Sequence, residues 1–170
     1  MSLFNSLFGK SDSTSGPTVS PQHVEAIFQL TAQHVANLKD ATKLSYALIL
    51  PYLLRSSASM MIRSHGLAFA KSYYAKSLQD LSAPPDGISL RPVENFRNPE
   101  PPGDQQAMFN DFTKLMDHMT NDLLSRGLDP LDIGYAYFKF AIEVATKTDG
   151  YYAAGLIVAC ARELNENKIR

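Results

Sequence analysis

The segment PLDIGYAYFKFAIEVATKT, residues 130–148, decides the predicted fold. Two apolar rows run along it at the 3-4 spacing of a helix. One row consists of Leu131, Tyr135, Phe138 and Ile142, and the opposite row of Ile133, Tyr137, Phe140 and Val144. Only a narrow polar strip is left for water, formed by Asp132, Lys139, Glu143 and Lys147. A helix that is apolar on two sides must be covered on two sides. We therefore expect one face to pack in the core and the other to meet a second subunit through Tyr137, Phe140 and Val144.

Helical periodicity continues on both sides of this segment. Residues 153–164 carry one apolar stripe, and residues 108–123 carry another, formed by Met108, Phe109, Phe112, Leu115, Met116, Met119 and Leu123. Ser20 followed by Pro21 is typical of a helix start. The run LSYALILPYLL, residues 44–54, is apolar nearly all round and predicts a central helix that Pro51 kinks or breaks. Two shorter helices follow, divided at Gly66.

No strand-type alternation longer than four residues competes with these helical periods. The sequence therefore predicts an all-α fold, a single bundle of about six helices over residues 20–170. Residues 82–103 hold six of the ten prolines, so they form a long Pro-rich connection, either a strap over the bundle or a ligand or partner loop. We favour the strap. Residues 165–170 are polar and are expected to fray.

Composition limits the function classes. The chain has 170 residues, 45% of them hydrophobic, and a net charge of -1, which suits one globular domain and argues against a nucleic-acid-binding protein. Cys160 is the only cysteine, so no disulfide forms within the chain and a cytoplasmic location is expected. The net charge is close to zero because two oppositely charged regions of the chain cancel each other. Residues 39–80 have six bases and two acids, or +4, whereas residues 94–149 have ten acids and five bases, or -5. Such polarity favours head-to-tail association or a charged partner.

One cluster offers chemistry. Asp111, His118 and Asp122 lie at i, i+7 and i+11 on one flank of a helix, and His118 with Asp122 form an i, i+4 pair. They could orient a base or offer ligands to a metal, but a solvated helix edge has the same pattern and is the interpretation that we favour. Cys160 belongs to an apolar stripe, where a thiol behaves as a small hydrophobic group. No glycine-rich phosphate loop or paired-cysteine site occurs. We expect no cofactor and no catalytic residue.

The N-terminal segment, residues 1–19, combines an amphipathic peptide with a flexible Ser-rich linker. Leu3, Phe4, Leu7 and Phe8 would share one side of a two-turn helix, with Lys10 adding positive charge. Such a peptide can fill a groove on a partner or on the domain itself. Disorder, and insertion of residues 2–10 into a membrane surface, remain the alternatives.

These observations favour a non-enzymatic, cytoplasmic interaction or regulatory domain. It would self-associate, with a dimer favoured, or bind a protein partner, and the N-terminal peptide would be a second contact element. The first alternative is a helical small-ligand or metal binder, or an enzyme, with a dispersed site that includes His118, Asp122, Tyr135 and the Pro-rich connection. A peripheral membrane protein is the weaker alternative.

Overall fold

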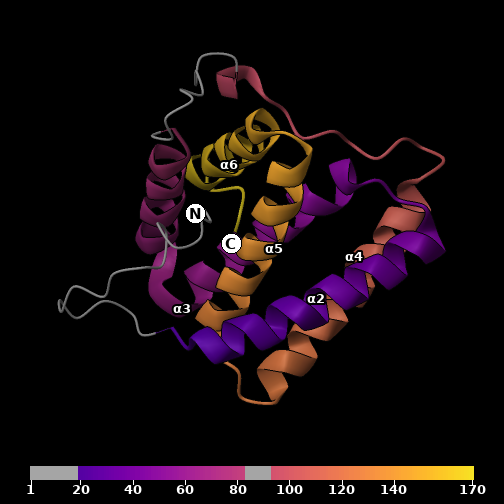
Figure 1. Cartoon of the computed structure of the whole chain (residues 1–170), viewed down its shortest axis with the longest axis horizontal. Coiled ribbons are helices and arrows are strands. Elements are labelled where there is room, and N and C mark those ends of the chain that lie inside the picture. The colour runs from indigo at the N-terminus through magenta and orange to yellow at the C-terminus, as the bar shows by residue number, and fades with distance from the viewer. Residues whose placement is uncertain (1–18, 83–92) are drawn as a thin grey trace.

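The computed structural model describes residues 19–82 and 93–170, and this part of the chain is all-helical (Figure 1). It contains five α-helices, close to the expected six, together with the short 3-10 turn η1 (Val93–Asn95). The helices are α2 (Pro21–Thr42), α3 (Tyr46–Ser82), α4 (Gln106–Ser125), α5 (Pro130–Thr148) and α6 (Gly150–Asn165). Ser20 caps α2, as its hydroxyl accepts a hydrogen bond from the His23 backbone N–H. The N-terminal peptide and residues 83–92 lie outside the described residues.

Helix α3 differs from the expectation at Pro51. The helix runs through this proline, and the only residue inside it with non-helical dihedral angles is Gly66, at φ 83°. Pro51 is the sixth residue of the helix. Proline lacks a backbone N–H, so only one intrahelical hydrogen bond is lost, close to the N-terminal end, where the first N–H groups have no partner in the helix anyway. The prediction of a break at Pro51 is wrong for this reason, and the predicted division at Gly66 is confirmed because glycine tolerates positive φ.

Helix α5 lies in the middle of the molecule and packs against α2, α3 and α6 (Figure 1). Gly134 allows its close contact with α3, since a Cβ there would lie 3.0 Å from the Ser57 carbonyl oxygen. The Ser57 hydroxyl in turn donates to the Gly134 carbonyl oxygen over 2.7 Å, which satisfies a buried donor where the helices touch.

Two residues of the polar strip of α5, Asp132 and Lys139, hold α2 and do not face water as the sequence suggested, whereas Lys147 is exposed as expected. Asp132 is only 3% exposed, and its carboxylate accepts the Ser20 backbone N–H at 3.0 Å. His23 Nδ1 lies 3.1 Å from the other oxygen of the same carboxylate. Two turns further along, the Lys139 ammonium pairs with Glu25 at 2.5 Å and lies over the Phe28 ring. The charges of α5 thus position the first half of α2.

Both apolar rows of α5 are covered from within the chain. Tyr137 is 0% exposed and its hydroxyl is 2.8 Å from that of Thr120 on α4, while Phe140 is 5% exposed and packs on Phe28. Val144 is half-buried against the same core. The expected subunit contact at Tyr137 and Phe140 therefore has no surface in this fold, because α2, α3, α4 and α6 fill the space that a second subunit would need.

Residues 93–96 are fastened to α6. The Arg162 guanidinium donates to the carbonyl oxygens of Glu94 and Phe96, and the Phe96 ring lies directly on Gly155. Gly155 has no side chain and so leaves room for this ring. Residues 93–96 of the Pro-rich connection therefore form a strap held on α6.

Candidate functional site

The predicted cluster of Asp111, His118 and Asp122 lies on the outer side of α4. All three residues are exposed. Asp122 pairs with Arg126 at 2.8 Å and Asp111 with Lys114 at 3.6 Å, both within the helix. The described residues contain no group of three or more His, Cys, Asp or Glu side chains that could hold a metal ion. Within the described residues, no other helix therefore places a third metal ligand beside this cluster.

The same side of α4 also exposes two large apolar residues that the sequence placed in the core. Met108 is 47% exposed and Leu115 is 45% exposed. The stripe facing the core is narrower than predicted, and its buried members are Phe112, Met116, Met119, Thr120 and Leu123. We call the exposed set of Met108, Asp111, Leu115, His118 and Asp122 the outer row. It combines apolar and charged side chains on one face of the helix.

Tyr135, which belongs to the dispersed-site alternative, does not join this surface, and neither does Cys160. Tyr135 is 8% exposed and its ring packs edge-on against Tyr73, with the centroids 5.0 Å apart. Cys160 is 1% exposed, and burial raises the pKa of its thiol to about 12. A thiol that stays protonated cannot act as a nucleophile. Tyr135 and Cys160 are therefore buried away from the exposed His118 and do not form a site with it.

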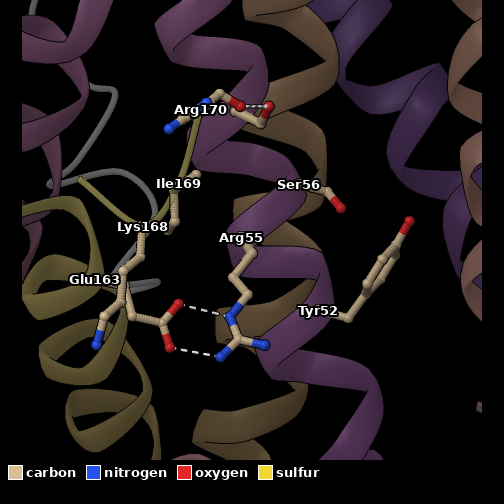
Figure 2. Close-up of a pocket in the computed structure, with 8 residues that line it drawn as sticks. Tyr52, Arg55, Ser56, Glu163, Lys168, Ile169 and Arg170 are labelled. Carbon is tan, nitrogen blue, oxygen red and sulfur yellow. Dashed lines mark hydrogen bonds and ion pairs between the residues drawn. The ribbon is translucent and has the colours of Figure 1, made fainter. Parts of the chain in front are cut away.

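A pocket that sequence reasoning missed lies between α3 and the C-terminal residues (Figure 2). One wall is a single face of α3 at i, i+3, i+4 and i+7, formed by Tyr52, Arg55, Ser56 and Ser59. The other wall consists of Glu163, Lys168, Ile169 and Arg170. We call this space, with a volume of about 570 Å³, the tail pocket.

The tail pocket exists because the C-terminal residues fold back, contrary to the expectation that they fray. Asn167 adopts a left-handed backbone conformation with φ 55°, which reverses the chain after α6. Ile169 is consequently only 8% exposed and joins the hydrophobic core. The Ser59 hydroxyl donates to the Arg170 carbonyl oxygen over 2.5 Å and fixes the end of the segment. A lone isoleucine in a polar hexapeptide was the only sequence signal for this arrangement.

An ion pair with two hydrogen bonds joins the two walls of the tail pocket. Arg55 donates from Nε and Nη2 to the two carboxylate oxygens of Glu163, over 2.6 and 2.5 Å. These hydrogen bonds raise the pKa of Arg55 above its ordinary value, so the guanidinium stays charged. Nearby, the Tyr52 hydroxyl donates to Asp117 on α4, and burial followed by this hydrogen bond raises the pKa of Tyr52. The pocket therefore carries fixed charges, and Tyr52 stays neutral.

Comparisons with known protein families, with curated proteins and with solved structures found no match to this chain. Within residues 19–82 and 93–170, no helix is long and apolar enough to cross a bilayer. Leu3, Phe4, Leu7 and Phe8 fall outside the described residues, so their role as a docking peptide stays a prediction.

Proposed function

We propose that the protein is a helical interaction domain that self-associates through the outer row of α4. The observation that carries this proposal is the exposure of Met108 and Leu115, two turns apart, on the same side of α4 as Asp111, His118 and Asp122. The outer row follows the 3-4-3-4 spacing by which one helix packs along another. The proposal keeps the self-association expected from the sequence and moves its surface from α5 to α4.

A second copy fits this surface because the centre of the outer row, Asp111, Leu115 and His118, is complementary to itself. When two α4 helices pair antiparallel about a two-fold axis beside Leu115, the two Leu115 side chains meet. Asp111 lies about 6 Å before Leu115 along the helix, and His118 about 4.5 Å after it. Antiparallel pairing therefore brings Asp111 of each copy opposite His118 of the other. Two-fold symmetry makes this contact twice, as isologous interfaces require.

The intrahelical pair of Asp111 and Lys114 does not oppose this contact. Its side chains are 70% and 76% exposed and 3.6 Å apart, and exposed pairs of this kind contribute little free energy. Asp111 can therefore exchange this partner for His118 of the second copy. The outer row spans only about 21 Å of helix, so the interface is at the small end of the range and a weak, reversible dimer is expected.

Sedimentation velocity over increasing protein concentration tests the proposal. We expect the wild-type chain to shift from monomer to dimer. His118→Asp places carboxylates opposite Asp111 and should weaken the dimer about tenfold or more, since like charges across an interface repel. Adding Asp111→His to this variant again places a histidine opposite each carboxylate and should restore the dimer.

His65→Asp is the matched control, because it makes the same substitution at an exposed position on α3. It should leave dimerization unchanged. A wild-type chain that stays monomeric at every concentration would refute self-association. A dimer that ignores both substitutions in α4 would refute this surface.

The N-terminal peptide would supply a second contact, as the sequence suggests. Sedimentation with anionic lipid vesicles, for the full chain and for a chain lacking residues 2–10, tests the membrane alternative. Equal recovery of both chains in the supernatant would remove that alternative.

A further inference from the structure

We infer that the tail pocket binds a small organic anion that carries a carboxylate or phosphate group. This site is separate from the outer row, and it adds ligand binding to the proposed self-association. Its volume of about 570 Å³ lies within the usual range for small-molecule sites. Its lining combines cations, hydroxyl groups and a small apolar surface from Ile169 and the Tyr52 ring.

The charge of the lining favours an anion. Arg55, Lys168 and Arg170 are cationic, and Glu163 is the only carboxylate side chain among the lining residues. Lys168 is paired with Glu166, which lies outside the lining, but this pair is 67% and 45% exposed and is screened by solvent. The lining side chains therefore carry a net charge of +2, three cations against one carboxylate, which favours an anionic ligand over a cationic one.

The Arg55 side chain is held ready for such a ligand. Glu163 engages Nε and Nη2, which fixes the plane of the guanidinium. Nη1 has no hydrogen bond to any described residue, and Figure 2 shows it on the side of the guanidinium away from Glu163. Arginine recognises carboxylate and phosphate oxygens through such planar N–H groups. Because Glu163 has already ordered the side chain, a ligand would not bear that entropic cost.

A hydroxyl group completes the polar part of the site. Figure 2 shows the Ser56 hydroxyl on the Tyr52 side of Arg55, one residue along the same face of α3. Hydroxyl groups donate hydrogen bonds to anions, so Ser56 supplies a donor on the α3 wall of the pocket. Ile169, on the opposite wall, would contact the apolar body of the ligand.

Titration followed by amide chemical shifts in NMR tests this inference. The probes are benzoate, phenyl phosphate and inorganic phosphate, with benzyl alcohol as the uncharged analogue. Shifts should centre on residues 52–59 and 163–170 for benzoate, for phenyl phosphate, or for both, and this distinguishes a carboxylate site from a phosphate site. Inorganic phosphate should bind more weakly because it has no apolar body. Benzyl alcohol should cause no saturable shift.

Variants separate binding from folding. Arg55→Gln with Glu163→Gln removes both charges and leaves a neutral pair, so neither partner is buried alone. It should weaken binding about tenfold or more, the loss of one charged hydrogen bond. Arg63→Gln is the matched control, because it removes a charge from an exposed position on the same helix, and it should retain the wild-type affinity. The inference fails if neither aromatic anion binds, if benzyl alcohol binds equally well, or if the double variant, folded by its amide spectrum, binds as the wild type does.

Discussion

Gly155→Ala tests the attachment of the strap to α6, because two effects of opposite sign compete at this position. Gly155 lies inside α6, where alanine favours the helix over glycine by about 1 kcal/mol. In this structure, however, an added Cβ would lie 2.5 Å from Cδ2 and 2.7 Å from Cγ of Phe96. These carbons belong to the part of the ring nearest the backbone, so a small rotation cannot move both of them away.

The Phe96 backbone is also held in place. Its carbonyl oxygen accepts a hydrogen bond of 3.0 Å from Arg162, and its ring packs on Tyr152 with the centroids 5.9 Å apart. Overpacking of a fixed site costs about 1–3 kcal/mol. With the gain in helix propensity subtracted, Gly155→Ala should lower the free energy of unfolding by about 1 kcal/mol. In a Phe96→Ala background the clash is absent, and the same substitution should raise the free energy of unfolding by about 1 kcal/mol.

Urea denaturation followed by circular dichroism measures all four members of this double-mutant cycle. The structure predicts a change of sign between the two backgrounds. If Gly155→Ala stabilises the chain with Phe96 present, the ring does not occupy the place described and the strap is not seated on α6.

Three further predictions concern α5, α6 and α2. Asp132→Ala removes two part-buried hydrogen bonds at the start of α2, so it should lower the free energy of unfolding by about 1–3 kcal/mol; unchanged urea denaturation would contradict this. Cys160, with its pKa raised to about 12, should react with a thiol reagent only as fast as the protein unfolds, and rapid stoichiometric reaction of the folded chain would contradict its burial. The hydrogen bond from Lys139 lowers the pKa of Glu25 below 4.5, so this pair stabilises the fold above that pH and the contribution is lost as the pH falls through the lowered pKa. A Glu25→Gln variant should accordingly lose less stability on acidification than the wild type, as urea denaturation at a series of pH values would measure.

Local sequence patterns were enough to predict the all-helical fold and several helix boundaries, although not the continuation of α3 through Pro51. Ser20 with Pro21, and Gly66, mark boundaries through backbone chemistry that involves only neighbouring residues. The two apolar rows of residues 130–148 correctly indicated a helix covered on two sides. The pattern could not say which element covers each side, because it records burial and not the identity of the neighbour.

The polar strip of α5 shows where periodicity misleads. Asp132 and Lys139 lie on the polar face of their helix, and isolated charges on such a face are usually solvated. Here each meets a residue more than 100 positions away in the sequence, Asp132 at the start of α2 and Lys139 at Glu25. A pairing of that separation leaves no local signal, so the strip was assigned to water.

The candidate surfaces were foreseen to different degrees. The sequence singled out Asp111, His118 and Asp122 as one helix flank. The structure adds Met108 and Leu115 to the same side, because the buried stripe of α4 is narrower than the apolar stripe in its sequence. The tail pocket could not be foreseen. It depends on the pairing of Arg55 with Glu163, 108 residues apart, and on the reversal at Asn167 that returns Ile169 to the core.

Disulfide formation by a Leu115→Cys variant tests the central claim most directly. The proposed two-fold axis passes beside residue 115, so the two introduced thiols would meet within bonding distance, and the buried Cys160 would not compete for them. Mild oxidation should convert most of this variant into a covalent dimer on non-reducing electrophoresis. Lys114→Cys, exposed on the same helix but outside the outer row, should form much less. Equal yields from the two variants, or a Leu115→Cys chain that stays monomeric, would contradict pairing through the outer row of α4.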